Sequence, residues 1–253
     1  MKKKRILLKI GSNTLTKETD HISRGKIEDI GRQIAGLKDQ YEFVIVSSGA
    51  IAAAKQFVKL EHNGQDITVK QALASIGQPH LMRIFQENFR ELGLFTSQCL
   101  LSYSDFEKDV SKQNICSTID VLVANNFIPI INENDTVATD EIKFGDNDKL
   151  AALTAALIKA DLLIIATNTD GIYTKESIDD RNPQTITQVH NLADLEKEIN
   201  TSKSSHGTGG MRSKIEAATI AQKAHIETWI VNGIKDNFII NALADKINFT
   251  TIK

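Results

Sequence analysis

The sequence contains little cysteine. Its 253 residues include only two, Cys99 and Cys116, and neither lies in a Cys-x-x-Cys or Cys/His spacing. Both cysteines have apolar neighbours in the sequence, so we expect buried free thiols rather than a disulfide or a metal site.

The sequence also lacks a charge excess and a long hydrophobic run. Its formal net charge is −2, whereas proteins that bind nucleic acids in general carry a basic excess. The only basic run, residues 2–5, precedes an apolar stretch too short for a secretory signal, and no segment is long enough to span a bilayer. We therefore expect a cytoplasmic protein that binds neither nucleic acid nor a membrane.

Two common nucleotide-binding patterns are missing as well. The chain has no GxGxxG dinucleotide fingerprint and no Walker motif, so any nucleotide site belongs to another fold. Internal repeats and low-complexity segments are also absent. Hydrophobic residues make up 41% of the chain, which is enough for a substantial core.

Apolar, strand-like runs alternate with helix-like patterns along the chain. The continuous run 161–167 is typical of a strand buried on both faces, as in a parallel sheet covered by helices, so we expect an α/β fold. The predicted strands are 5–10, 43–46, 95–101, 127–131, 161–167, 185–189 and 228–231. The predicted helices are 27–37, 51–58, 69–92 with an interruption near Gly77-Gln78-Pro79, 114–126, one from 151, 193–199, one ending near 224, and 238–243.

Two strand ends run into glycine turns. Lys9 lies near the end of the first strand, before Gly11. It is either a charge on an edge strand or a cation directed into a site, and the turn favours the site. Ser48, Gly49 and Ala50 follow the second strand, where free N–H groups of a helix start can bind an anion. Serine at this position also caps helices without any ligand.

Two polar segments occupy similar positions. Residues 132–148, rich in carboxylates and amides, join an apolar strand to an apolar helix, where α/β folds usually carry binding groups. A solvated surface loop could have the same composition. Residues 207–214 lead into a helix with a lysine near its start, as in a phosphate cradle. A flexible linker is the alternative interpretation.

These segments, taken in order, resemble the amino acid kinase family, and most closely its branch that phosphorylates glutamate. They read KIGS (9–12), SSGAIAA (47–53), IINENDTV (130–137), EIKFGDND (141–148) and GTGGMRSK (207–214). The resemblance covers almost the full chain. It implies a three-layer αβα sandwich around a mainly parallel sheet, with one domain over residues 1–253. The amino acid would bind toward the N-terminal half and ATP toward the C-terminal half. Many members of this branch carry a C-terminal PUA domain, which we do not expect here.

The resemblance also implies a reaction. ATP, accompanied by Mg²⁺ held mainly by phosphate oxygens and water, would phosphorylate the side-chain carboxylate of L-glutamate in the first step of proline biosynthesis. Proline would be a feedback inhibitor, and the protein would form a homodimer or a homotetramer. The alternatives are a kinase for another acid, such as acetylglutamate or aspartate, and a non-catalytic amino-acid sensor on the same scaffold.

Roles for individual residues follow from the same resemblance. Lys9 and Lys214 would contact the transferred phosphoryl group, and Asp148 would orient both lysines. Asp135 would pair with the α-ammonium group and Asn147 would donate to a carboxylate oxygen. Asn132, Ser48, Gly49 and Ala50 complete the predicted substrate site. The predicted nucleotide site consists of Lys9, Gly11, Thr167, Asn168, Thr208, Gly209, Gly210, Met211, Arg212, Ser213 and Lys214.

Three features leave alternatives open or depart from the family pattern. Asp146 could share the role of Asp148 or be solvated, and Lys143 could contact ligand or form a salt bridge within its loop. The turn after the fifth strand often reads Thr-Asp in the family, whereas here it reads Thr167-Asn168.

Overall fold

The structure is a computed structural model that describes residues 3–17, 19–60, 66–138, 147–177, 180–192, 195 and 208–253. Its strands are β1 (Lys4–Ile10), β2 (Tyr41–Ser47), β3 (Phe95–Leu101), β4 (Phe127–Glu133), β5 (Leu162–Thr167), β6 (Gln188–Val189), β7 (Glu227–Asn232) and β8 (Thr250–Ile252). Its helices are α1 (Ser12–Thr16), α2 (Arg24–Leu37), α3 (Ala50–Lys55), α4 (Ile67–Glu91), α5 (Asp109–Ala124), α7 (Asp148–Leu157), α9 (Thr208–Lys223) and α10 (Phe238–Leu243), with short 3₁₀ turns at Tyr103–Phe106 and Lys175–Ser177.

The described strands form one sheet in the order β3-β4-β2-β1-β5-β7-β8-β6. Neighbouring strands are parallel except β7 and β8, which are antiparallel. The expected mainly parallel sheet is therefore confirmed. Because β1 lies between β2 and β5, the edge-strand interpretation of Lys9 is wrong. The strands that precede β5 in the sequence lie on one side of β1, and β5 and the later strands lie on the other. In such folds, ligands bind where the strand order reverses, beyond the carboxyl ends of the strands.

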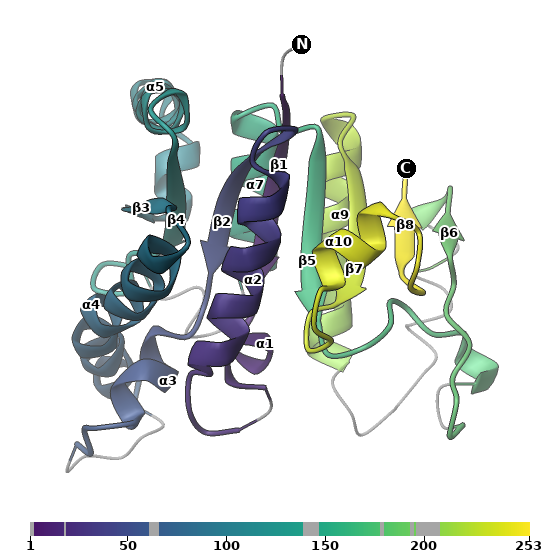
Figure 1. Cartoon of the computed structure of the whole chain (residues 1–253), viewed down its shortest axis with the longest axis horizontal. Coiled ribbons are helices and arrows are strands. Elements are labelled where there is room, and N and C mark those ends of the chain that lie inside the picture. The colour runs from purple at the N-terminus through teal and green to yellow at the C-terminus, as the bar shows by residue number, and fades with distance from the viewer. Residues whose placement is uncertain are drawn as a thin grey trace.

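Helices cover both faces of the sheet, which gives the expected three layers (Figure 1). Alternate residues of a strand point to opposite faces, so Ile6, Leu8 and Ile10 of β1 pack into the core beneath α2, α4 and α10. Leu7 points the other way, into the core shared with α5, α7 and α9. Lys9 has the same parity as Leu7, so its side chain lies on the α7 and α9 side.

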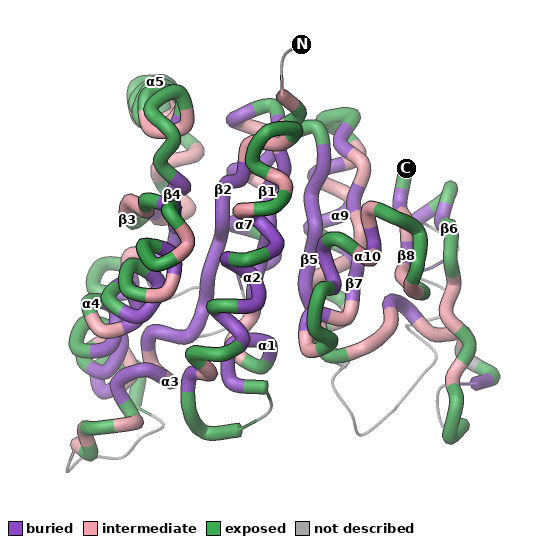
Figure 2. The backbone as a smooth tube through the Cα atoms, in the orientation of Figure 1, coloured by how far each residue is buried: buried purple, intermediate pink, exposed green. Residues whose placement is uncertain are grey.

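The central strands β1, β2 and β5 are buried over most of their length (Figure 2). Residues 162–166 of β5 are all buried, as the unbroken apolar run predicted. Helix α5 differs from these strands, because Ile119 is its one fully buried residue. It begins at Asp109, five residues before the predicted start at Asn114. Within the described residues, no helix is long and apolar enough to cross a membrane.

The prediction for the cysteines is only half right. Cys99 and Cys116 are free thiols, but both are partly exposed rather than buried. Cys99 lies on β3, at the edge of the sheet, and Cys116 lies on the exposed helix α5. Their apolar sequence neighbours therefore belong to elements that are covered on one side only.

The predicted interruption of the 69–92 helix is wrong. Helix α4 runs unbroken over Ile67–Glu91 and contains Pro79 in its interior. Gly77, two residues before Pro79, is required by packing rather than by a break in the helix, because a Cβ atom there would lie 1.8 Å from the carbonyl oxygen of Ala50. Glycine thus lets α4 pack directly on the backbone of α3, and this packing outweighs the poor helix propensity of the segment.

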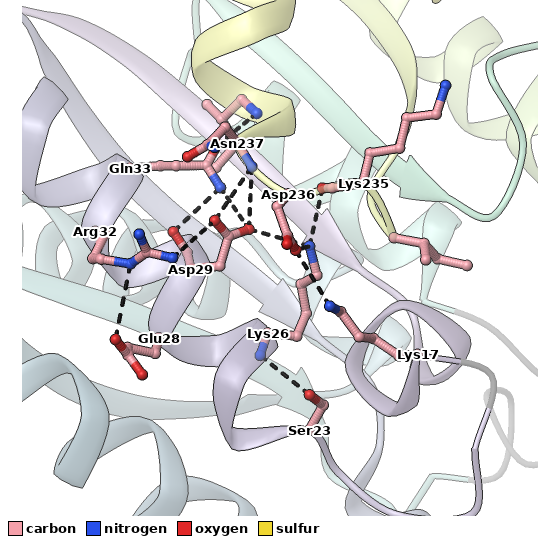
Figure 3. Close-up of polar contacts among 12 residues, drawn as sticks. Lys17, Ser23, Lys26, Glu28, Asp29, Arg32, Gln33, Lys235, Asp236 and Asn237 are labelled. Atoms are coloured by element: carbon pink, nitrogen blue, oxygen red, sulfur yellow. Dashed lines mark hydrogen bonds and ion pairs between the residues drawn. The ribbon is translucent and has the colours of Figure 1, made fainter.

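A buried polar cluster joins α2 to the loop before α10 (Figure 3). The Nζ of Lys26, which is 0% exposed, donates to Asp29 Oδ2 at 3.1 Å, to the Lys235 carbonyl at 3.0 Å and to Asp236 Oδ1 at 3.2 Å. Gln33 Oε1 accepts from the backbone N–H of Ile239 at 2.7 Å. The cluster satisfies free N–H groups at the start of α10 and fixes the loop that follows β7.

Candidate active site

Lys9 and Asp148 form a buried ion pair beside the carboxyl end of β1. The Lys9 Nζ lies 2.6 Å from Asp148 Oδ1, and the side chains are 3% and 0% exposed. Asp148 is the first residue of α7, the helix that covers the face of β1 to which Lys9 points. The structure therefore directs Lys9 into a polar site, as the glycine turn predicted.

A second lysine reaches the same carboxylate from α9. The Lys214 Nζ lies 3.0 Å from Asp148 Oδ2, and the Ser213 hydroxyl donates to that oxygen at 2.8 Å. Burial alone would disfavour the charged carboxylate, but Lys9 and Lys214 outweigh it and hold the pKa of Asp148 well below its ordinary value. Asp148 thus stays ionised and keeps the two ammonium groups close together, one on each oxygen.

Three side-chain amides form a buried chain next to this ion-pair cluster. Asn147 Nδ2 donates to the Ser47 carbonyl at 3.1 Å and to Asn132 Oδ1 at 2.8 Å. Asn132 Nδ2 donates in turn to Gln78 Oε1 at 2.8 Å. Both N–H bonds of Asn147 are therefore used within the protein, and its remaining atom, Oδ1, is an acceptor. The predicted donation by Asn147 to a substrate carboxylate does not fit this geometry, because the amide offers an acceptor instead.

Asp135 is a buried carboxylate that follows β4. It is 8% exposed, and among the described residues it forms no ion pair. Burial, together with the charge of Glu133, raises the pKa of Asp135 to about 7, against an opposing effect of its own backbone N–H. A cation placed beside Asp135 would restore its charge, so the site suits an ammonium group.

The glycine turn after β2 lies next to the amide chain. Ser48 is 2% exposed, its N–H donates to the Ile10 carbonyl at 3.0 Å, and its hydroxyl has no partner among the described residues. Gly49 has φ of 105° and is the N-cap of the short helix α3, whose first residue is Ala50. The turn after β2 is therefore hydrogen bonded to the carboxyl end of β1.

Most of the predicted nucleotide residues lie at the carboxyl ends of β1 and β5 or at the start of α9. A Cβ atom on Gly11 would lie 3.4 Å from Lys9 Nζ, so the Gly11 backbone passes close to this ammonium group. Helix α9 begins at Thr208, so Gly209 and Gly210 belong to its first turn. Met211 packs on a core cluster and Arg212 is exposed.

Thr167 and Asn168 are the predicted nucleotide residues at the carboxyl end of β5. Thr167 ends β5, and its hydroxyl lies 3.5 Å from Asn168 Oδ1. Lys143 and Asp146, whose roles the sequence left open, lie outside the described residues.

Sequence reasoning missed Gln78. It was interpreted as part of a break in a helix, whereas it is 7% exposed and hydrogen bonded to a predicted site residue. The available signal was its position: a glutamine next to a glycine, inside a helix with an apolar face, whose role appears only when the helix is packed on β4.

Comparison with known proteins agrees with this arrangement. Residues 4–232 match the model of the amino acid kinase family. The chain is 42% identical over 92% of its length to the glutamate 5-kinase of Geobacter sp. strain M21, and it spans 63% of that relative. It is 39% identical over 96% of its length to the glutamate 5-kinase of Neisseria gonorrhoeae strain NCCP11945, of which it spans 83%.

Solved structures share the fold at lower identity. The UMP kinase of Ureaplasma parvum aligns over 100% of both chains with a TM-score of 0.66 and 19% identity. The carbamate kinase of Giardia lamblia bound to AMP-PNP aligns over 99% of this chain and 98% of its own, with a TM-score of 0.69 and 16% identity. On the family match and the relatives together, the chain belongs to the amino acid kinase family.

Proposed function

We propose that this chain transfers the γ-phosphoryl group of ATP to the side-chain carboxylate of L-glutamate. The product is L-glutamate 5-phosphate, and the reaction is the first step of proline biosynthesis. The observation that carries the proposal is the convergence of Lys9 and Lys214 on Asp148, beside the carboxyl end of the central strand. The similarity to two glutamate 5-kinases supports the choice of acceptor.

The chemistry requires cations more than a base. A glutamate side chain has a pKa near 4.3, so at neutral pH it is already an anionic nucleophile. Its approach to a polyphosphate is opposed by charge repulsion, and charge remains on the transferred group in the transition state. Lys9 and Lys214 face one carboxylate, so their ammonium groups can offset this repulsion in a site of low dielectric constant. Asp148 keeps them in place and needs no proton transfer.

The other end of the substrate has partners of suitable chemistry. Burial and the charge of Glu133 raise the pKa of Asp135 to about 7, and an α-ammonium group beside it would favour the ionised carboxylate. Asn147 Oδ1, a buried acceptor, offers a second contact to that ammonium group. The Ser48 hydroxyl and the backbone of Gly49 and Ala50 would then bind an anionic part of the substrate.

Mg²⁺ would accompany ATP. Among the described residues, no cluster of three or more His, Cys, Asp or Glu side chains could hold a metal ion. We expect phosphate oxygens and water to hold the ion, as is common for Mg²⁺ in phosphotransfer sites. When bound, the ion neutralises phosphate charge; Lys9 and Lys214 would position the transferred group.

The proposal extends to the setting of the enzyme. Residues 1–253 would act as one amino acid kinase domain, with the substrate near β2, β4 and α4 and the nucleotide near β5 and α9. The reaction would take place in the cytoplasm, proline would inhibit it, and the chain would form a dimer or a tetramer.

The test is an acyl-phosphate assay. The chain is incubated with ATP, Mg²⁺, hydroxylamine and L-glutamate, and the product is trapped as the hydroxamate; aspartate, N-acetylglutamate and no acceptor are run in parallel. We expect hydroxamate only with glutamate. Turnover only with another acceptor would overturn the proposed substrate. ATP binding without turnover on any acceptor would instead indicate an amino-acid sensor.

A further inference from the structure

Three buried polar atoms near the carboxyl ends of β2 and β4 have no hydrogen-bond partner among the described residues. They are the Ser48 hydroxyl, Gln78 Nε2 and Asn147 Oδ1. A buried polar group without a partner costs about 1–3 kcal/mol, and such groups in folded proteins need a specific explanation. Since Gln78 and Asn147 belong to one hydrogen-bonded chain, the same ligand can satisfy both.

The orientation of each amide in this chain follows from the backbone. The Glu133 N–H donates to Asn132 at 2.9 Å, so that atom of Asn132 is the oxygen. Its other terminal atom is then the nitrogen, which donates to Gln78, so Gln78 must present its oxygen to Asn132. The free atom of Gln78 is therefore Nε2, which carries two N–H donors. An acceptor is required there.

The position of Gln78 indicates which part of the substrate it meets. Gln78 is attached through Asn132 to β4, whereas Lys9 lies on β1, and β2 separates these two strands. Neighbouring strands lie roughly 4.8 Å apart, so Gln78 is about two strand spacings away from the strand that carries Lys9. The end of the amino acid remote from the transferred phosphoryl group carries the α-carboxylate.

We propose that Gln78 is a substrate-binding residue that selects for the α-carboxylate. Gln78 Nε2 donates to an α-carboxylate oxygen, while Gln78 Oε1 holds Asn132, which in turn holds Asn147 with its oxygen toward the α-ammonium group. Gln78 is thereby a donor to the α-carboxylate, and through Asn132 it keeps Asn147 as an acceptor for the α-ammonium group. This inference rests on the proposed phosphorylation of glutamate, and it adds a residue that the motif-based prediction did not include.

The decisive variant is Gln78→Glu. One carboxylate oxygen of Glu can still accept from Asn132, but the other is an acceptor where the substrate needs a donor. We expect the KM for L-glutamate to rise at least about tenfold, with the KM for ATP within about twofold of wild type. In L-isoglutamine a carboxamide replaces the α-carboxylate. Its N–H group can donate to the second carboxylate oxygen of the Gln78→Glu variant. The preference for glutamate over isoglutamine, measured as a ratio of kcat/KM values, should fall by about tenfold or more.

Two further variants keep the test decisive. Gln78→Met removes the donor without adding charge, so it should raise the KM for glutamate without improving isoglutamine. Gln86→Glu adds the same charge at an exposed position of α4 and should match wild type. If wild type turns over glutamate, and both Gln78 variants keep the wild-type KM for glutamate and the wild-type preference for glutamate over isoglutamine, this inference alone is overturned. Absence of glutamate turnover in wild type would overturn the proposed function and this inference with it.

Discussion

The described part of the molecule contains two buried lysine–aspartate clusters, and they differ in what surrounds them. In the cluster of α2, the three hydrogen-bond donors of Lys26 have three acceptors, and Asp29 also accepts from Gln33 and from the Asn237 N–H. In the cluster at β1, two lysines share the single carboxylate of Asp148. The donors of Lys26 are all used within the first cluster, whereas in the second, among the described residues, two ammonium groups face one carboxylate.

The difference separates a structural cluster from a candidate catalytic one. A buried ion pair is costly to desolvate, and it persists where further hydrogen bonds satisfy its atoms. The cluster around Lys26 meets that condition by tying α2 to α10. The cluster around Asp148 is positioned by three elements, β1, α7 and α9, and its second cation is suited to an anion that arrives from solution. Burial of a lysine alone therefore does not identify an active site. The balance of positive and negative charge around the lysine separates a candidate catalytic cluster from a structural one.

The largest effect is expected from Lys9→Met. Removal of one of two cations at the transferred group should lower kcat by about 10³-fold, by analogy with the loss of one charge-stabilising donor in other active sites. The free energy of unfolding should change less than in the Lys26 variant below, because Lys214 still neutralises Asp148. Hydroxamate formation and chemical denaturation measure the two quantities. Activity near the wild-type level would contradict the role of Lys9.

A smaller effect on activity and a larger effect on stability are expected from Lys26→Met. Loss of Lys26 leaves the buried Asp29 with only the exposed Arg32 as a cationic partner, at 3.5 Å, which should lower the free energy of unfolding by about 3 kcal/mol. The kcat of the folded fraction, measured at low temperature, should stay within about threefold of wild type. If Lys26→Met instead lost activity at unchanged stability, the distinction between the two clusters would fail.

The smallest effect concerns Asp135 and pH. Its pKa of about 7 lies above the ordinary 3.8, so the protein binds this proton more tightly when folded than when unfolded. The associated stability is full below about pH 4 and is lost as pH rises through 7. Glutamate binding shows the opposite trend, because an ammonium group requires ionised Asp135. The KM for glutamate should rise roughly tenfold per pH unit below 7.

A matched variant sharpens this test. Asp135→Asn removes the titrating group, so its KM for glutamate should be high and independent of pH between 6 and 8. Calorimetry in buffers of different ionisation enthalpy should show proton release when wild type binds glutamate near pH 7. A wild-type KM that stays flat over this range would argue against Asp135 as the ammonium partner.

Much of the fold and part of the site follow from local sequence. The unbroken apolar run of β5 predicts a strand buried on both faces, and the alternation along β1 places Lys9 on the face of Leu7 rather than that of Leu8. Gln78 could not be found in this way. Its contact with Asn132 depends on how closely α4 approaches α3, and that distance is set by Gly77 against the Ala50 carbonyl. Local propensity instead predicted a break there.

The exposure of the cysteines was unpredictable for a similar reason. Apolar neighbours indicate a buried thiol only if the element is covered on both sides. The sequence of β3 does not say that it forms an edge, because edge position depends on strand order. The donor or acceptor character of Asn147 likewise depends on the Ser47 carbonyl, a backbone group at the end of another strand.

The pairing of β1 with β5 has a consequence for biosynthesis of the protein. The Arg5 N–H donates to Asp161 across 156 positions of sequence, and Lys9 pairs with Asp148 on α7, which is also far from β1 along the chain. Closing so long a loop is entropically unfavourable until many other contacts reward it. During synthesis, β1 therefore waits for its neighbour β5 until all the residues between the two strands have been made. The ion-pair cluster of Lys9, Asp148 and Lys214 can therefore assemble only after α9 has emerged from the ribosome.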